Sequence, residues 1–318
     1  MTDACVNTLL AQATGGDRSA LARLLSLIES NPQVEAHVRV ALATTESKAV
    51  VLGITGPPGA GKSTLISATL PYAVQAYQRT AVLAVDPSSP FTGGALLGDR
   101  VRMQGHGLGQ NVFIRSMASR GESGGLARTT ATAIQLLDAC DWPLIILETL
   151  GIGQVELDVM DLATAVVVVL NPGWGDTFQA NKAGLTEAGD IFVINKADKD
   201  GVQRTRVDLQ DSLSLLKTAI PIEIVETIAA EKHGIEEFWH AVERYLAAAS
   251  KHGMLTEIQL KRRRRLLFRL MQRDLESQLS AFTRSTVGEQ YMGAVLAGTM
   301  SIEQFKAHFF ATIMPSSK

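Results

Sequence analysis

A glycine-rich segment near residue 60 has the residues that a phosphate-binding loop needs. It follows the pattern G-x-x-x-x-G-K-[ST] and consists of Gly56, Pro57, Pro58, Gly59, Ala60, Gly61, Lys62, Ser63 and Thr64. The apolar run 49–55 precedes it and a segment of helical pattern follows, which is the context the motif requires. Glycines let backbone N–H groups turn towards phosphate oxygens, and the helix N-terminus adds partial positive charge. We expect Lys62 to reach the β- and γ-phosphates of a nucleoside triphosphate, and the Ser63 hydroxyl to bind Mg²⁺.

A second polar cluster has the residue types that recognise a guanine base. Asn195, Lys196, Ala197 and Asp198 give the pattern N-K-x-D after the predicted strand 190–194. The carboxylate of Asp198 can accept hydrogen bonds from both N1–H and the 2-amino group of guanine, whereas adenine has no such pair of donors. Asn195 would support the base and the loop, and the aliphatic part of Lys196 would pack on the ring. The pattern also fits a helix cap at a turn, but its place after a phosphate loop and a late strand predicts binding of GTP or GDP.

Three carboxylates stand where a Mg²⁺ ion beside the phosphates would need them. Asp86 and Glu148 each close an apolar run that is predicted as a strand, and Asp99 lies in a loop between them. Mg²⁺ prefers oxygen ligands and keeps several waters, so one or two carboxylates with phosphates suffice. A single acid at a strand end is more often solvated, but two such strand ends in one domain favour a metal site. Gly151 completes an E-x-x-G pattern that starts at Glu148, and its backbone N–H can bond to a γ-phosphate.

Two further segments leave alternatives open. The segment 172–176 is Gly-rich and carries Trp174, which suits either a mobile protein-contact loop or an ordinary strand-to-helix connection. The basic block 261–265 fits a solvated helix face, an ion-paired dimer seam or, least well, a nucleic-acid contact. His106 and His233 have no second His or Cys at ligand spacing, so we predict no metal at either.

The elements that must position these residues follow from hydrophobic periodicity. Residues 1–47 show helical spacing and predict an N-terminal helical extension. Residues 48–250 alternate short β-branched runs with helical segments, which predicts a mostly parallel sheet covered by helices, with ligands at the carboxyl ends of its strands. Residues 251–318 are helical again, and Ser301 stands near a capping position with Glu303 and Gln304. The predicted fold class is therefore α/β: a P-loop NTPase domain between two helical flanks. The predicted strands are 49–55, 80–85, 111–115, 143–148, 165–170, 190–194 and 222–225, and the helices between them include 62–78, 124–139, 203–218 and 235–249.

Composition limits the function classes. The chain has 318 residues, of which 46% are hydrophobic and 19% charged, as in a soluble globular protein with a sizeable core. A net charge of -2 argues against general nucleic-acid binding. Its two cysteines, Cys5 and Cys140, form no C-x-x-C pair, which fits a reducing cytoplasm. No secretory signal is evident, and the longest apolar run, 163–170, is too short to cross a membrane.

The motifs occur along the chain in a characteristic order. They are G-P-P-G-A-G-K-S-T, V-D-P-S-S, L-G-D-R-x-R-M, F-I-R-S, E-T-x-G-x-G-Q, P-G-x-G-D and N-K-A-D. Together they closely resemble the MeaB/ArgK-type GTPases, chaperones of adenosylcobalamin-dependent acyl-CoA mutases. The resemblance covers the whole nucleotide domain and extends more loosely into both helical flanks.

The resemblance implies a GTP-hydrolysing metallochaperone, or G-protein, that is a homodimer with a C-terminal dimerisation arm. Such proteins hydrolyse GTP slowly, bind a mutase, gate delivery of the adenosylcobalamin that belongs to that partner, and protect or reactivate it. Asp86, Asp99 and Glu148 match the family's Mg²⁺-binding and water-positioning acids. Gln179 and Lys182 fall in the loop that helps the partner to raise GTP hydrolysis.

The chain also departs from the family pattern. The late guanine loop commonly contains S-A, and here it consists of Thr227, Ile228, Ala229 and Ala230. A backbone N–H from Ala229 can still reach O6 of guanine, so guanine specificity is expected to survive. Ser123, Trp174 and the sequence D-T-F-Q at 176–179 differ in switch or partner-facing loops. These departures leave the mutase open: methylmalonyl-CoA mutase is the first expectation, and isobutyryl-CoA and 2-hydroxyisobutyryl-CoA mutases are alternatives.

Three other classes of protein share parts of this pattern. A GTPase for nickel-enzyme maturation would need a Cys/His cluster, which the sequence lacks. An ATP-dependent kinase linked to amino-acid transport would not need the pattern from Asn195 to Asp198. A signal-recognition-type GTPase would need a Met-rich helical domain, whereas the nine Met residues are scattered.

Overall fold

The computed structural model describes residues 2–45, 47–86, 109–118, 125–149, 160–173, 189–216, 218–251 and 253–313. The chain divides into two compact units, Met1–Arg263 and Arg264–Lys318, which are described separately. Within the described ranges, no helix is both long and apolar enough to span a bilayer.

The first unit is built on a seven-stranded sheet in the order β3-β2-β4-β1-β5-β6-β7. All its pairings are parallel. Its strands are β1 (Val50–Thr55), β2 (Thr80–Asp86), β3 (Val112–Ala118), β4 (Leu144–Thr149), β5 (Ala165–Leu170), β6 (Ile191–Asn195) and β7 (Glu223–Thr227). Every residue of β4, β5 and β6 is buried, as expected for Val- and Ile-rich strands that are covered on both faces. The predicted α/β fold is confirmed, and β1 lies in the middle of the sheet.

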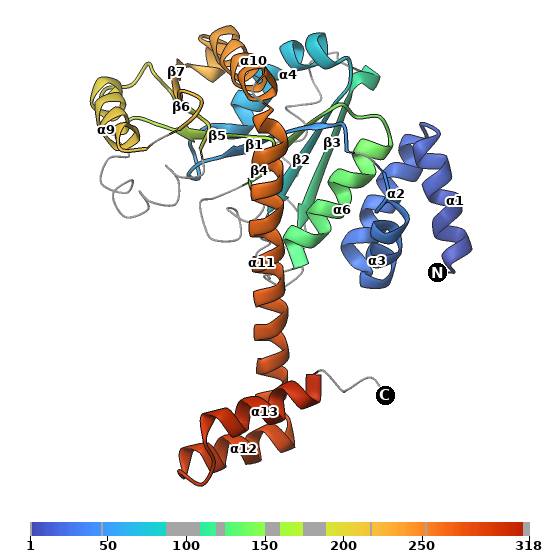
Figure 1. Ribbon diagram of the computed structural model, residues 1–318. Helices are drawn as coiled ribbons and strands as arrows, with labels where there is room; N and C mark the ends of the chain where they lie inside the picture. Colours follow the sequence, from blue (N-terminus) through green and yellow to red (C-terminus); the bar gives the residue numbers. More distant parts are fainter. Residues whose placement is uncertain are drawn as a thin grey trace. The chain divides into compact units, whose positions relative to one another are not determined.

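Helices cover both faces of the sheet (Figure 1). On one face, α4 (Lys62–Tyr77) and α10 (Ile235–Lys251) pack in one apolar cluster. On the other face, α6 (Gly125–Ala139) and α9 (Val202–Ser214) belong to a second cluster. Short 3₁₀ turns, η1 (Gly109–Asn111) and η2 (Ala229–Glu231), precede β3 and follow β7. The alternation of strand and helix thus produces the layers that the sequence predicts.

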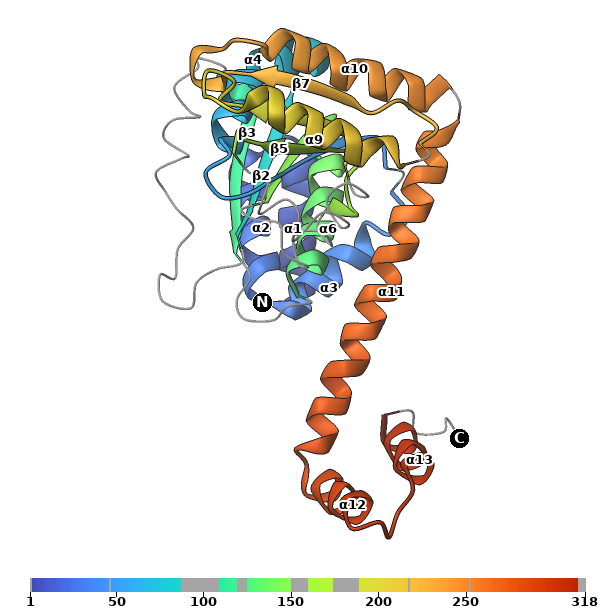
Figure 2. The same cartoon turned by 90° about the vertical axis from the view of Figure 1, so that its left-hand side faces the viewer.

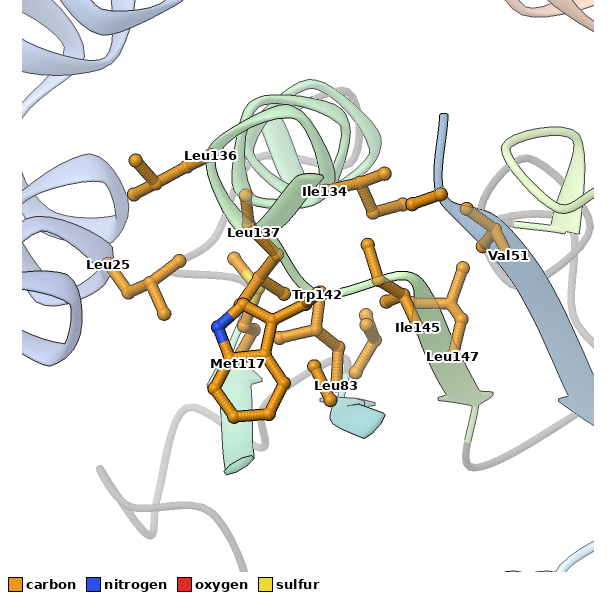
Figure 3. Packing of buried hydrophobic residues seen from close by; sticks show 14 of the residues in the cluster. Leu25, Val51, Leu83, Met117, Ile134, Leu136, Leu137, Trp142, Ile145 and Leu147 are labelled. Atoms are coloured by element: carbon orange, nitrogen blue, oxygen red, sulfur yellow. The ribbon is translucent and has the colours of Figure 1, made fainter. Parts of the chain in front are cut away.

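Three N-terminal helices pack beside α6 (Figure 2). They are α1 (Asp3–Thr14), α2 (Arg18–Ser30) and α3 (Pro32–Ala41). Figure 3 shows Leu25 of α2 in one cluster with Leu137 of α6 and the fully buried Trp142. Two polar contacts add to this packing: Arg115 of β3 pairs with Glu29, and Thr132 of α6 donates to buried Glu35 at 2.6 Å.

Two of the N-terminal helices, α2 and α3, begin at side-chain caps. The carboxylate of Asp17 accepts hydrogen bonds from the backbone N–H of Ser19 and Ala20 at the start of α2. Asn31 caps α3 in the same way, with Pro32 at the first helical position, where its missing N–H costs no hydrogen bond. These caps fix where the helices start, so that their apolar faces meet the sheet domain.

The second unit comprises the end of α11 (Met254–Thr283) with α12 (Thr286–Leu296) and α13 (Ile302–Ile313). Its small core is aromatic: Phe282 contacts Tyr291, Phe305 and Phe309, with ring centroids 5.5 to 6.4 Å apart. Ser301 and Gln304 cap α13 reciprocally, because each side chain accepts from the other's backbone N–H. The capping position expected from the sequence is confirmed.

Candidate functional site

The glycine-rich loop leaves β1 at the carboxyl edge of the sheet and leads into α4. Two of its glycines are required by close contacts. A Cβ on Gly56 would lie 2.0 Å from the carbonyl oxygen of Val169 on β5, and one on Gly61 would lie 2.3 Å from Nδ2 of Asn195. Both have positive φ, +146° and +92°, which L side chains rarely adopt. The loop can therefore press against β5 and β6 only with glycine at these positions.

The side chain of Lys62 bonds to the backbone of its own loop. Its side chain is buried, and its Nζ donates to the carbonyl oxygens of Gly56 at 2.8 Å and Pro57 at 3.0 Å. An ammonium group has three donors in a compact head, so the same position can serve phosphate oxygens. The ammonium group of Lys62 is thus enclosed by the phosphate loop at the start of α4.

Two oxygen-bearing side chains meet where α4 faces β4. The hydroxyl of Ser63 donates to Oε1 of Glu148 at 2.6 Å, and Glu148 is only 3% exposed. Next to them, Thr149 donates to the hydroxyl of Thr55 at 2.9 Å and joins the ends of β4 and β1. A side-chain hydrogen bond therefore links the carboxyl ends of the two strands.

The residues fit a Mg²⁺ site that is completed by phosphates. A hydroxyl and a carboxylate are hard oxygen ligands, and the backbone of Asp86 ends β2, the neighbour of β4, at the same edge. The part of the chain that the structure describes has no group of three His, Cys, Asp or Glu that could hold a metal alone. Mg²⁺ does not need such a group, because it is commonly held by one or two carboxylates, waters and substrate phosphates.

Asn195 connects the phosphate loop with the predicted guanine loop. Its Nδ2 donates to the carbonyl oxygen of Ala60 at 2.8 Å. Its Oδ1 accepts from the hydroxyl of Thr227 at 3.1 Å and from the backbone N–H of Ala229 at 3.0 Å. The residue is buried, so both ends of its amide are satisfied within the protein. One side chain thus fixes two loops that lie more than a hundred residues apart in sequence.

The remaining guanine-motif residues lie around Asn195. Lys196 has a left-handed backbone (φ 59°), and its Nζ donates to the carbonyl oxygen of Gly59 at 2.7 Å. Asp198 is exposed, so its carboxylate is accessible to a ligand. Ile228, Ala229 and Ala230 follow β7, which pairs with β6 in the register Asn195 to Thr227. The two predicted guanine segments therefore meet at adjacent strand ends.

Several predicted site residues have no described geometry. Asp99, Gly151, Gln179 and Lys182, together with Trp174, lie outside the described residues. For Asp86 only the backbone is described. Sequence reasoning did not single out the hydroxyl contacts of Thr55, Thr149 and Thr227. In the sequence, these contacts are indicated only by a threonine at the end of each strand.

Comparison with known proteins gives a consistent result. Residues 21–284 match the family model described as methylmalonyl Co-A mutase-associated GTPase MeaB. A protein of Pyrococcus abyssi named as a GTPase is 44% identical over 266 residues, which cover 82% of this chain and 81% of that protein. GTPase ArgK of Escherichia coli is 35% identical, covering 76% of each chain. The methylmalonic aciduria type A homolog of Mus musculus, a mitochondrial protein, is 32% identical over 93% of this chain and 76% of its own.

The fold is shared with a solved structure. The crystal structure of an LAO/AO transport system kinase superposes with a TM-score of 0.72 at 24% identity, covering 99% of each chain. That likeness concerns the fold, whereas the family match rests on the sequence of residues 21–284, which include the loops described above. The chain belongs to the MeaB family of methylmalonyl-CoA mutase-associated GTPases.

Proposed function

We propose that this GTPase binds an adenosylcobalamin-dependent acyl-CoA mutase, gates loading of its cofactor, and protects or reactivates it. The nucleotide part is supported by the contact of Asn195 with both Ala60 and Ala229, because this contact joins the phosphate loop to the loop that we propose reads guanine. The mutase part is supported by the family, whose name associates it with methylmalonyl-CoA mutase. The nickel-enzyme and transport-kinase alternatives have no comparable support.

Each site residue has a proposed role. The loop 56–64 holds the phosphates through backbone N–H groups and Lys62. Ser63, with Asp86, Asp99 and Glu148, would hold Mg²⁺ and position water, and the metal would neutralise charge that develops on the phosphate oxygens. Gly151 would bond the γ-phosphate. Lys196, Asp198 and the loop of Ile228, Ala229 and Ala230 are proposed to contact guanine, and Asn195 to support the base by holding the two loops. The N–H of Ala229, which we expected to reach O6 of guanine, donates to Asn195 instead.

Hydrolysis by the chain alone is proposed to be slow and to rise with the partner. Gln179 and Lys182 follow Pro172 and Gly173 in the sequence, and Gly173 has a positive φ of +86°. A bound mutase would bring Lys182 towards the charge on the transferred phosphate. Such a group would act only in the complex, so fast turnover would need the partner.

The proposed partner is methylmalonyl-CoA mutase, with isobutyryl-CoA and 2-hydroxyisobutyryl-CoA mutases as the alternatives. The protein is proposed to be a homodimer through residues 251–318 and to work in the cytoplasm. Free Cys5 and Cys140 fit a reducing compartment. Adenosylcobalamin would be bound by the mutase and not by this chain.

Complex formation with purified apo-mutases tests the proposal. The chain is mixed with each mutase and either GDP or a non-hydrolysable GTP analogue, and adenosylcobalamin uptake by the mutase is followed by its absorbance. We expect one mutase to co-elute with the chain and to load cofactor at a rate that depends on the nucleotide. Lys62→Ala, which loses the phosphate-loop cation, is the matched control and should abolish the nucleotide dependence. Nucleotide-independent loading of every mutase would contradict the gating role.

A further inference from the structure

We propose that the first unit has a second ligand site, for a small organic anion, at the amino-terminal edge of the sheet. A pocket of about 480 Å³ opens there, a volume within the range of small-molecule sites. It is lined by residues that lead into β1, β2 and β4, among them Lys48, Arg79 and Trp142. Because the strands are parallel, their starts share the edge opposite to the phosphate loop. The pocket is therefore separate from the nucleotide site.

The pocket is lined by two cations and two carboxylates. Lys48 and Arg79 are its cations, and neither forms an ion pair with a described residue. The carboxylate of Asp138 accepts hydrogen bonds from the backbone N–H groups of Lys48 and of Ala49, each at 3.0 Å. Asp141 is the other acid of the lining and is exposed to solvent. The lining itself is therefore balanced in charge, and the donors of Lys48 and Arg79, not a net charge of the lining, are what an anion would use.

The guanidinium of Arg79 is held in a fixed position. It lies over the ring of Trp142, with 4.3 Å between Cζ and the ring centroid. Its only described hydrogen bond is a long one, 3.4 Å, to the carbonyl oxygen of Cys140. Arg79 therefore keeps donors for a ligand while its plane is fixed, which reduces the entropy lost on binding.

A second guanidinium makes this region more positive. Arg18 lies 5.5 Å from the ring centroid of Trp142 and donates to the carbonyl oxygens of Gln110 and Val112. Burial, and after it the charge of Arg79, lower the pKa of Arg18. Two like charges near one indole repel each other, and an anion in the pocket would offset that repulsion.

The backbone of the pocket has an unusual conformation. Four described non-glycine residues have a left-handed φ: Gln78, Asp141, Lys196 and Lys232. Lys196 and Lys232 lie in the loops of the guanine side, whereas Gln78 and Asp141 both line this pocket. A left-handed residue that is not glycine costs about 1–2 kcal/mol, and such residues gather at functional sites. The distribution fits a second site at the opposite edge.

Calorimetry on the full chain, saturated with GDP and Mg²⁺ so that the phosphate loop is filled, tests the site. The probes are inorganic phosphate, citrate and AMP, which separate phosphate from carboxylate recognition and a bare anion from one with a ring. We expect at least one probe to bind with one-to-one stoichiometry. Arg79→Gln and the exposed Lys48→Gln should each weaken it about tenfold, because each removes a charge-assisted hydrogen bond.

The matched control is Arg204→Gln, which removes an exposed arginine of α9 and should leave binding of the probe unchanged. Unaltered GDP affinity in each variant shows that it is folded. The proposal is overturned if no probe binds the wild-type protein at millimolar concentration. It is equally overturned if the probe binds both pocket variants as tightly as wild type.

Discussion

At the residue scale, the site depends on side chains that bond to backbone as much as to each other. Asn195 uses both ends of its amide on Ala60, Thr227 and Ala229, and Lys62 uses its ammonium on the loop's own carbonyls. Asp198, in contrast, is exposed and keeps its carboxylate for a ligand. The structure therefore separates a residue that builds the guanine loop from the one proposed to read the base.

Replacing Asp198 by Ala should weaken GDP binding by about tenfold to a hundredfold, because charge-assisted hydrogen bonds contribute roughly 1.5–3 kcal/mol. Calorimetric titration of GDP measures this effect. Asp200→Ala removes an exposed acid two residues away and should leave the affinity unchanged. A wild-type protein that prefers ATP to GTP would contradict the assignment of the base-reading loop.

Glu148→Gln should act on hydrolysis more than on GDP affinity. The change keeps the shape and a hydrogen bond to Ser63 but removes the charge that would attract Mg²⁺ beside it. We expect single-turnover GTP hydrolysis to fall by about tenfold or more and to need a higher Mg²⁺ concentration, because metal and preorganised charge carry much of such catalysis. Normal hydrolysis at low Mg²⁺ would remove Glu148 from the metal site.

At the element scale, periodicity predicted the seven strands and the helices that cover them, since apolar runs and their turns are local properties. The end of α9 was predicted at 218, but the helix ends at Ser214, and Leu215 beyond it is 84% exposed. The apolar pattern continued past the last residue that can pack on the sheet. Contacts such as Thr149 with Thr55 could not be predicted, because they depend on strand order, which periodicity does not specify.

Two glycines of the phosphate loop make a matched pair. Both Gly59 and Gly61 have positive φ, +76° and +92°, but a Cβ on Gly59 meets nothing within 4 Å, whereas one on Gly61 would strike Asn195. Gly59→Ala should cost only the backbone term of about 1–2 kcal/mol. Gly61→Ala should in addition displace Asn195 and abolish most GDP binding. Equal GDP affinity of the two variants in calorimetry would contradict this account of the loop.

At the scale of the whole molecule, the second unit carries apolar side chains in water. Leu267, Phe268 and Met271 of α11 are 57–61% exposed, and Leu275 and Leu279 continue the row at helical spacing. Exposed apolar rows of this kind are commonly covered by another chain. We predicted the domains 1–47, 48–250 and 251–318 from the sequence. The row lies in the last of these, which is the predicted dimerisation arm.

Truncation after Ser250 should therefore give a monomer that still binds GDP, because the nucleotide loops lie in the first unit. The full-length double variant Leu267→Glu/Met271→Glu should also be monomeric, since charge on the apolar row opposes its burial. Light scattering measures the mass of both proteins. An unchanged oligomer in both cases would place the subunit contact elsewhere.

GTP hydrolysis with and without the cognate mutase tests whether this nucleotide site is coupled to a cobalamin-dependent mutase. The wild-type rate should be low alone and rise when the mutase is added. Lys182→Ala should keep the basal rate and lose most of the stimulation, whereas Lys251→Ala, an exposed lysine of α10, should behave as wild type. Equal stimulation of Lys182→Ala would exclude the loop as the coupling element. A wild-type rate that no acyl-CoA mutase changes would contradict the proposed coupling of this GTPase to such an enzyme.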